Sequence, residues 1–407
     1  MPQTQRRFPN FHVLANPVGA KCNLDCHYCY YLEKEPYSSS GTPTMNDQVL
    51  ERYIRDYIAA QSGPEVNFLW QGGEPTLAGL DFFRRAIVLQ QKYAANKRVT
   101  NALQTNGTLL NDRWCEFLRK HQFLVGISID GPAHLHDRFR VNRRGEPTLQ
   151  ATLNGLAYLQ KHAVETNVLT CVHAGNQCHP MQVYEYLKSL GLRHLQLLPV
   201  VERVRRQATS ARLQLLHADD PRAVEVAPWS VEPQAWGEFL IALFDDWVRH
   251  DVATIFVQLF DVTLENWLGM TPSLCVFRET CGGAIALERN GDVYSCDHFV
   301  YPQHRLGNVG STSLEDLVES RQQQNFGDAK KNRLPEQCRQ CDVLFACRGE
   351  CPQHRFAVAT NGESGLNYLC AGYLKFFRHV QPYMDFMANE VRAGGIPARV
   401  MQFAATC

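Results

Sequence analysis

Short β-prone segments alternate with amphipathic helical segments over the first 200 residues, and this alternation limits the fold more than any other feature of the chain. The predicted strands cover residues 11–15, 66–71, 99–105, 123–130, 166–173 and 195–200. The predicted helices between them cover residues 46–60, 80–93, 112–120, 149–161 and 179–190. Repeated strand–helix units indicate a parallel sheet with right-handed crossovers. Because six units are fewer than the eight of a closed barrel, we expect an α/β fold with a partial (β/α)6 barrel.

Three cysteines with the spacing C-x3-C-x2-C follow the first predicted strand, at Cys22, Cys26 and Cys29. A 4Fe-4S cube contains four irons, so three thiolates leave one iron open to an exogenous ligand. This spacing therefore indicates a redox-active cofactor site rather than a closed structural site.

The next predicted strands also end in distinctive loops, at residues 71–75 (Gln-Gly-Gly-Glu-Pro), 104–107 (Gln-Thr-Asn-Gly) and 128–132 (Ser-Ile-Asp-Gly-Pro). The carboxyl ends of parallel barrel strands carry the functional loops, so we expect these loops to converge on one mouth. The paired glycines allow close approach of a ligand, and the Glu74 carboxylate can accept hydrogen bonds from an ammonium group. A strand-to-helix turn with Glu74 near the helix start is the structural alternative.

A second group of eight cysteines lies between Cys275 and Cys370, and four of them have the spacing C-x2-C-x5-C-x3-C. Four thiolates also suit tetrahedral zinc, so the spacing alone leaves two structural zinc sites open. A redox cluster upstream favours iron–sulfur clusters here, because additional clusters could carry electrons to or from the active site.

The sequence predicts four parts, which are a barrel with its connecting segment, linking helices, a cysteine-rich domain and a tail, at residues 1–235, 236–271, 272–385 and 386–407. The strand–helix alternation is lost over residues 201–233. Large apolar residues from Trp236 to Val248 recur at helical spacing, which predicts a buried helix face. Asn290-Gly291 between two apolar runs predicts a β-hairpin.

The charge balance excludes a bulk electrostatic partner, because Lys plus Arg and Asp plus Glu both number 41. We therefore expect neither nucleic acid nor an anionic membrane as a partner. The first residues do not resemble a signal peptide, and the apolar runs are too short to cross a bilayer. The sequence predicts a cytoplasmic protein, in which fifteen cysteines are metal ligands more readily than disulfides.

The opening cysteine motif, with the aromatic Tyr28 before its last cysteine, resembles that of the radical S-adenosylmethionine (SAM) enzymes. The Gly-Gly-Glu run and the six strand–helix units are similar to that superfamily, and the C-terminal cysteines resemble its SPASM extension. Within this group, residues 71–80, 104–108, 130–132 and 291–298 are similar to the anaerobic sulfatase-maturating enzymes. The likeness extends from about residue 10 to residue 385.

The resemblance implies S-adenosyl-L-methionine and three 4Fe-4S clusters as cofactors. Cys22, Cys26 and Cys29 would hold the SAM-binding cluster. The auxiliary clusters would be held by two interleaved sets, which are Cys275, Cys281, Cys296 and Cys351, and Cys338, Cys341, Cys347 and Cys370. The contacts to S-adenosylmethionine would come from Tyr28, Gly72, Gly73, Glu74, Ser128, Arg140 and Val201.

The implied reaction is the oxidation of a cysteine or serine in an unfolded sulfatase to Cα-formylglycine (3-oxoalanine) under anaerobic conditions. The implied partners are a sulfatase polypeptide with a C/S-x-P/A-x-R motif and a low-potential electron donor such as flavodoxin or ferredoxin. Asp297 would take the proton of the target side chain, and Gln71 would contact the target peptide. A carboxylate that caps the turn after the hairpin is the structural alternative for Asp297.

Two other functions are compatible with parts of the pattern. Another SPASM-type peptide maturase would make a thioether or carbon–carbon crosslink in a ribosomal peptide. The early position of Cys22 argues against this alternative, because it leaves no room for a leader-peptide recognition domain before the barrel. A non-catalytic iron–sulfur carrier or a zinc scaffold is disfavoured by the open three-cysteine loop and the Gly-Gly-Glu run.

Overall fold

The computed structural model of this chain describes residues 6–31, 34, 43–207, 210–216 and 225–405. These residues form two compact units, and each unit is assembled from separate stretches of the sequence. The first unit contains Met1–Ser128, Val141–Thr166 and Thr280–Ala329, and the second contains Ile129–Arg140, Asn167–Glu279 and Lys330–Cys407. The four predicted parts are continuous stretches of the sequence, and their boundaries stay predictions.

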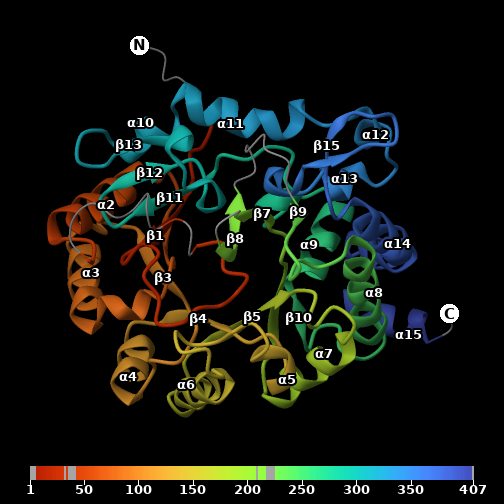
Figure 1. Cartoon of the computed structure of the whole chain (residues 1–407), viewed down its shortest axis with the longest axis horizontal. Helices are drawn as coiled ribbons and strands as arrows, with labels where there is room; N and C mark the ends of the chain where they lie inside the picture. The colour runs from red at the N-terminus through yellow and green to blue at the C-terminus, as the bar shows by residue number, and fades with distance from the viewer. Residues whose placement is uncertain (1–5, 32–33, 35–42, 208–209, 217–224, 406–407) are drawn as a thin grey trace. The chain divides into compact units, whose positions relative to one another are not determined.

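Four parallel strands form the centre of the first unit, in the order β4-β3-β2-β1. They are β1 (His12–Asn16), β2 (Glu65–Trp70), β3 (Arg98–Thr105) and β4 (Phe123–Ser128). The helices of this unit are α2 (Asp47–Ala60), α3 (Leu80–Tyr93), α4 (Asp112–Lys120) and α6 (Leu149–Lys161). Figure 1 shows α2, α3 and α4 on the outer side of these strands. The predicted alternation is confirmed here, with element ends close to those expected from the pattern.

Large aromatic side chains pack between β2 and the helices α2 and α3. The ring of Trp70 on β2 meets those of Tyr53, Phe82 and Phe83 edge to face, with centroids 5.9, 5.7 and 5.6 Å away. The indole N–H of Trp70 donates to Oδ1 of Asn101 on β3 at 2.8 Å, so this buried polar group is satisfied. Such packing holds the strands rigidly and fixes where their carboxyl ends lie.

The predicted hairpin is confirmed and extends the sheet of the first unit. Strand β11 (Ala284–Glu288) pairs in parallel with β1, and β12 (Asp292–Tyr294) and β13 (Arg305–Asn308) continue in antiparallel pairing. Gly291 in the connecting turn has φ +86°, a conformation that glycine adopts without strain. The same unit contains α10 (Leu314–Val318) and most of α11 (Arg321–Asn332).

The second unit contains most of the strand β5 (Thr166–Val172) and the strands β6 (His194–Pro199) and β10 (Phe256–Val257), which are parallel to one another. Its main helices are α7 (Pro180–Ser189), α8 (Pro233–His250), α9 (Gln258–Trp267) and α14 (Cys370–Arg392). Shorter helices are α5 (Ala133–His136), α12 (Glu336–Arg339), α13 (Leu344–Cys347) and α15 (Val400–Ala404), and β14 (Ala357–Val358) pairs with β15 (Ser364–Leu366). The apolar stripe of α8 is buried, which confirms the predicted helix face.

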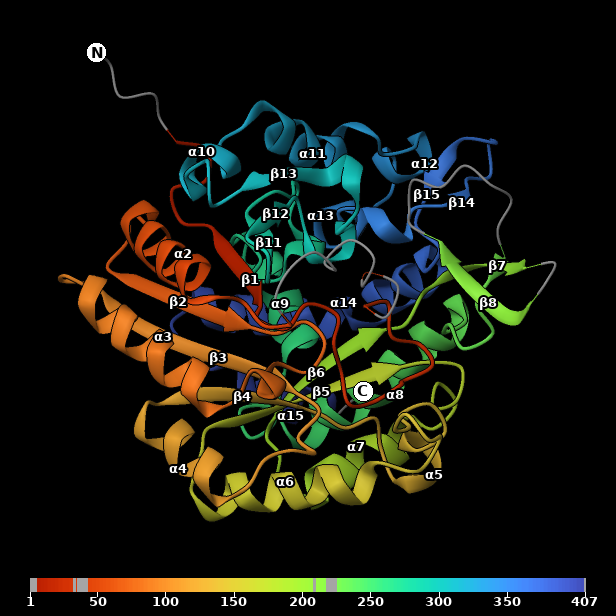
Figure 2. The ribbon, with the colours of Figure 1, turned by 60° about the vertical axis from the view of Figure 1, so that its left-hand side comes forward.

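The segment over residues 201–233, where the strand–helix alternation is lost, contains a small antiparallel sheet. Its strands are β7 (Arg203–Gln207), β8 (Ser210–Leu216) and β9 (Glu225–Val226), and Figure 2 shows β7 beside β8. Arg203 and Val204 are both buried, so burial does not alternate with period two along this part of the sheet. Sequence analysis missed it because the strands are short and charged. None of the described helices is both long and apolar enough to span a bilayer.

Candidate functional site

The loop that carries Cys22, Cys26 and Cys29 follows β1 and is anchored from two sides. On one side, the backbone N–H groups of Gly73 and Glu74 donate to the carbonyls of Gly19 and Lys21 at 2.8 and 2.9 Å. On the other side, Asp25 N–H donates to the Val141 carbonyl at 2.8 Å, and Arg143 Nε donates to the Cys22 carbonyl at 2.9 Å. The backbone of the loop that carries the three thiols is therefore fixed by hydrogen bonds to other segments of the first unit.

The two glycines after β2 are required by this anchoring. Gly72 has φ +111°, and a Cβ atom on Gly73 would lie 2.1 Å from the carbonyl oxygen of Lys21. A side chain at either position would push the cysteine loop away from the strand ends. In the structure, the backbone of the cysteine loop is what lies close to these glycines. The predicted contacts of Gly72 and Gly73 with S-adenosylmethionine stay predictions.

The carboxylate of Glu74 is buried and accepts four hydrogen bonds from its own chain. It accepts hydrogen bonds from the N–H and hydroxyl of Thr76 at 3.0 and 2.5 Å, from the Thr105 hydroxyl at 2.8 Å and from Asn106 N–H at 2.9 Å. Burial raises the pKa of Glu74, and these hydrogen bonds oppose the increase. The structure thus shows the alternative of a strand-to-helix turn, because the Glu74 side chain caps η2 (Pro75–Ala78). The same carboxylate links the end of β2 to the end of β3 by hydrogen bonds. Its predicted contact with an ammonium group stays a prediction.

Asp297 lies in the first unit beside the end of the cysteine loop. Its Oδ2 accepts from the Tyr30 hydroxyl at 2.9 Å, and its Oδ1 accepts from the Cys296 thiol at 3.2 Å. The Lys34 ammonium donates to the Asp297 carbonyl and lies 4.5 Å from the centre of the Tyr30 ring. Burial opposes ionisation, but His298, Lys34 and the hydrogen bonds from Cys296 and Tyr30 together outweigh it and lower the pKa of Asp297 to about 2. Asp297 is therefore a carboxylate at neutral pH.

Tyr30, Tyr31 and Lys34 were not identified as site residues from the sequence. The aromatic run after Cys29 was the available signal, but it gives no indication of partners more than 250 residues away. The Tyr31 hydroxyl donates to Glu288 Oε1 at 2.8 Å, and Asn16 Nδ2 donates to the same oxygen at 2.7 Å. Asn16 and Glu288 are register partners at the ends of β1 and β11, so the hairpin brings this carboxylate to the cysteine loop.

The other predicted contacts of the cofactor and peptide are distributed over both units. Ser128 ends β4 and accepts a hydrogen bond from Gln104 Nε2 at 3.2 Å in the first unit, which also contains Tyr28 and Gln71. Arg140 and Val201 are buried in the second unit, where the Arg140 guanidinium is paired with Asp130. The roles of these residues stay predictions.

Four of the C-terminal cysteines come together within the second unit, and they are Cys338, Cys341, Cys347 and Cys370. Cys338 lies on α12, Cys341 on the segment that follows it, Cys347 at the end of α13 and Cys370 at the start of α14. Burial raises the pKa of Cys347 to about 12 and that of Cys370 to about 11, and the neighbouring thiols of this set add to both increases. Metal binding would have to displace these protons. An all-thiol set of four fits a protein-ligated iron–sulfur cluster.

The other predicted set is divided between the units. Cys281 and Cys296 flank the hairpin in the first unit, where Gln323 of α11 donates from Nε2 to the carbonyls of Gly282 and Ser295, each at 3.0 Å. This buried amide joins the two cysteine loops, and sequence analysis missed it because glutamine on a helix carries no distinctive signal. Cys275 and Cys351 belong to the second unit, where Lys330 donates to the Cys275 carbonyl at 2.7 Å.

The cysteines within the described residues form no disulfide bond. In the same part of the chain, no three His, Cys, Asp or Glu side chains converge on the position of a single metal ion. A cube distributes its thiolate ligands over four iron atoms, so a cluster does not require the close convergence that one zinc ion does.

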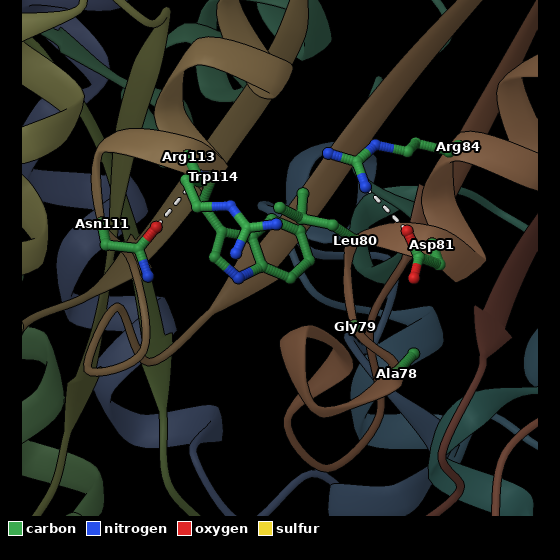
Figure 3. A pocket seen from close by; sticks show the side chains of 8 residues that line it. All are labelled: Ala78, Gly79, Leu80, Asp81, Arg84, Asn111, Arg113 and Trp114. Carbon is green, nitrogen blue, oxygen red and sulfur yellow. Dashed lines mark hydrogen bonds and ion pairs between the residues drawn. The ribbon is translucent and has the colours of Figure 1, made fainter.

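A shallow pocket between the starts of α3 and α4 contains none of the predicted site residues (Figure 3). Arg84 at its edge is paired with Asp81 at 2.7 Å, and the Asn111 side chain accepts from Trp114 N–H as the cap of α4. Its main polar groups are therefore engaged in local structure.

The chain matches two family models. The model of the Radical SAM superfamily matches residues 16–187, and the model of SPASM, an iron–sulfur cluster-binding domain, matches residues 275–342. The first range contains the three-cysteine loop, and the second contains the hairpin with the cysteines that flank it.

Several proteins are similar to most of this chain. A serine-type anaerobic sulfatase-maturating enzyme from Bacteroides thetaiotaomicron is 46% identical over 96% of this chain and 94% of its own length. A cysteine-type anaerobic sulfatase-maturating enzyme from Clostridium perfringens is 31% identical over 94% of this chain and 100% of its own. A solved structure of native anSMEcpe with bound AdoMet and a Cp18Cys peptide superimposes with a TM-score of 0.81 at 30% identity, covering 93% of this chain and 99% of that one. Streptococcus suis SuiB bound to its precursor peptide SuiA, at 12% identity and a TM-score of 0.60, shares the fold over 88% of this chain and 76% of its own.

Proposed function

Because this chain belongs to the anaerobic sulfatase-maturating enzymes of the radical SAM superfamily, we propose that it oxidises a serine or cysteine of an unfolded sulfatase to Cα-formylglycine. The observation that carries the proposal is the 46% identity to a serine-type relative over 94% of that protein. The predicted fold class, a radical SAM domain followed by a SPASM domain, is confirmed by the family and structure matches. The protein is a radical SAM oxidoreductase whose cofactors are S-adenosylmethionine and 4Fe-4S clusters.

Cys22, Cys26 and Cys29 would hold the SAM-binding cluster, on a loop whose anchoring by Glu74, Val141 and Arg143 supports this role. When bound, this cluster and S-adenosylmethionine supply the radical that takes a hydrogen atom from Cβ of the target residue. The contacts proposed for S-adenosylmethionine come from Tyr28, Gly72, Gly73, Glu74, Ser128, Arg140 and Val201.

Asp297 would take the proton of the target hydroxyl or thiol. Its support is geometric, because the Tyr30 hydroxyl fixes Oδ2 and Lys34 fixes the backbone at the same residue. A thiolate ligand has no proton to donate, so a cluster bound by Cys296 would leave Oδ1 without the thiol hydrogen bond and available to the substrate. Gln71, at the end of β2, would contact the peptide.

Oxidation of serine to an aldehyde removes two protons and two electrons from the target. One hydrogen atom leaves Cβ, one proton goes to Asp297, and the remaining electron requires an acceptor. Two sets of four cysteines would hold the auxiliary clusters that accept it, and they are Cys275, Cys281, Cys296 and Cys351, and Cys338, Cys341, Cys347 and Cys370. Because both sets consist of four protein ligands, they suit electron transfer better than binding of the substrate.

We further propose serine as the preferred target, since the serine-type relative is 46% identical and the cysteine-type relative 31% identical to this chain. The proposed partners are a sulfatase polypeptide with a C/S-x-P/A-x-R motif and a low-potential donor of the flavodoxin or ferredoxin type. The cytoplasm is the proposed location, because it keeps grouped thiols reduced.

The test uses the anaerobically reconstituted full chain with S-adenosylmethionine, a chemical reductant and three peptides that differ only at the target, which is serine, cysteine or alanine. We expect 5′-deoxyadenosine and an aldehyde-bearing product with the serine peptide, less product with the cysteine peptide and none with alanine. A faster reaction of the cysteine peptide would overturn the serine preference. Absence of aldehyde from both peptides would overturn the proposed function, and a crosslinked product would favour the peptide-crosslinking alternative.

A further inference from the structure

Three side chains form a closed ring of hydrogen bonds beside Cys22. Asn23 Nδ2 donates to the Thr108 hydroxyl at 2.9 Å, and that hydroxyl donates to Asn106 Oδ1 at 2.7 Å. Asn106 Nδ2 closes the ring by donating to Asn23 Oδ1 at 2.9 Å. The ring joins the cysteine loop to the Gln-Thr-Asn-Gly segment after β3.

The orientation of the Asn106 amide is determined by its partners. Its Oδ1 accepts from the Thr108 N–H at 3.0 Å as well as from the hydroxyl of the same residue. A flipped amide would turn its two hydrogens toward the Thr108 N–H, which is itself a donor, so the flipped form is excluded. The backbone on either side is also held, because Asn106 N–H donates to Glu74 Oε2 and Thr152 donates to the Asn106 carbonyl at 3.0 Å.

An amide nitrogen carries two hydrogens, and Asn23 accepts one of them. The second faces the sulfur of Cys22, which lies 3.8 Å from Asn106 Nδ2. The backbone N–H of Leu24 approaches the same sulfur at 3.4 Å. Two N–H donors, one from a side chain and one from the backbone, are thus directed at the first cysteine of the loop.

We propose that Asn106 is a positioning residue that sets the side chain of Cys22 and raises the reduction potential of the SAM-binding cluster by donating an N–H to its thiolate. Hydrogen bonds to ligand sulfurs stabilise the additional negative charge of the reduced cluster, so each one shifts the potential upward. The proposal rests on the proposed function only in that Cys22 is a cluster ligand. It explains why an asparagine, rather than any residue that fits a turn, stands after Thr105.

The experiment compares the reconstituted full chain with Asn106→Ala, Asn106→Asp and the control Asn111→Ala. Asn106→Asp retains the acceptor oxygen for Thr108 and removes the N–H, and it carries the test if the alanine variant does not fold. Asn111 accepts from Trp114 N–H as a helix cap, and its carbonyl accepts from the N–H of Cys115, which is not one of the proposed ligands. Its substitution therefore perturbs local structure to a similar degree without changing the donors at Cys22. Iron and sulfide content and circular dichroism establish that the variants are loaded and folded.

The readout is the midpoint potential of the cluster whose electron paramagnetic resonance signal changes on addition of S-adenosylmethionine, measured without any peptide. We expect a more negative midpoint for Asn106→Ala, a still more negative one for Asn106→Asp because of its added charge, and the parent value for Asn111→Ala. An Asn106→Ala or Asn106→Asp potential equal to that of the parent, or an equal shift in Asn111→Ala, would overturn the proposal. Since no sulfatase peptide is present, this outcome is independent of whether the protein makes formylglycine.

Discussion

Asp130 and Arg140 form an ion pair inside the second unit, with 2.8 Å between Asp130 Oδ2 and Arg140 Nε and both side chains buried. The other carboxylate oxygen of Asp130 accepts from Cys171 N–H at 2.9 Å. Burial opposes ionisation of Asp130, but Arg140, His173 and His136 together outweigh it and hold the pKa well below its usual range. Asp130 therefore fixes the guanidinium that is proposed to contact S-adenosylmethionine.

Removing Asp130 should destabilise the protein strongly, because it leaves a buried guanidinium without its counter-charge. We expect Asp130→Ala to lower the free energy of unfolding by about 3–5 kcal/mol, as measured by urea denaturation in anaerobic buffer. The control is Glu238→Ala, which removes the exposed pair with Lys375 at 2.8 Å and should cost at most about 1 kcal/mol. An equal loss of unfolding free energy in the two variants would show that the buried pair stabilises the protein no more than the exposed pair does.

His136 should make stability depend on pH. Its Nδ1 accepts from Asp130 N–H at 3.3 Å, which requires the neutral ring. Burial lowers the pKa of His136 from 6.5 to about 4; nearby Arg140 and His173 act in the same direction, whereas Asp130 and Asp137 oppose it. Between pH 6.5 and pH 4 the unfolded chain binds a proton at His136 that the folded protein does not. The contribution of the neutral His136 to the free energy of unfolding is therefore complete above pH 6.5 and is lost as the pH falls toward 4.

The measurement is the loss of unfolding free energy between pH 7.5 and pH 5.0. We expect this loss to be smaller by about 2 kcal/mol in His136→Asn, whose amide oxygen can still accept from Asp130 N–H. His134→Asn on the same short helix is the control, since His134 is exposed. The prediction fails if His136→Asn and the parent lose the same stability on acidification.

Substitution of Asp297 should separate cofactor cleavage from peptide oxidation. Asp297→Asn retains the shape and cannot take a proton, so we expect 5′-deoxyadenosine to form while aldehyde formation falls by about 10²-fold or more. Tyr30→Phe removes the hydroxyl that donates to Asp297 Oδ2 and keeps the acid, so its effect on aldehyde formation should be smaller. Aldehyde formation by Asp297→Asn at the parent rate would exclude Asp297 as the base.

Gln323 should be required to hold the two cysteine loops of the first unit together. Gln323→Ala leaves the buried carbonyls of Gly282 and Ser295 without their donor, and each lost partner costs about 1–3 kcal/mol. We expect a lower unfolding free energy and a lower iron content after reconstitution. The neighbouring Gln322→Ala is the matched control, because Gln322 is exposed on the same helix. Full iron content and parent stability in Gln323→Ala would contradict this role.

Much of the secondary structure and the ligand spacing could be predicted from the sequence, because both are local properties. The period of the apolar residues placed the first six strands and their helices, and Asn290-Gly291 placed the hairpin. The spacing of Cys22, Cys26 and Cys29 was sufficient to indicate a cluster with an open iron. Each of these signals lies within a few residues of the feature that it predicts.

Only the tertiary structure decided which side chains meet. Strand β11 pairs with β1 across more than 250 residues, and this pairing brings Glu288 to Asn16 and Tyr31. The same folding places Asp297 against Tyr30, turns Glu74 inward and aligns Asn106 with Cys22. No local periodicity encodes these contacts, because they depend on how separate stretches pack. The order of residues along the chain thus specified the kind of chemistry, and packing specified which residues position it.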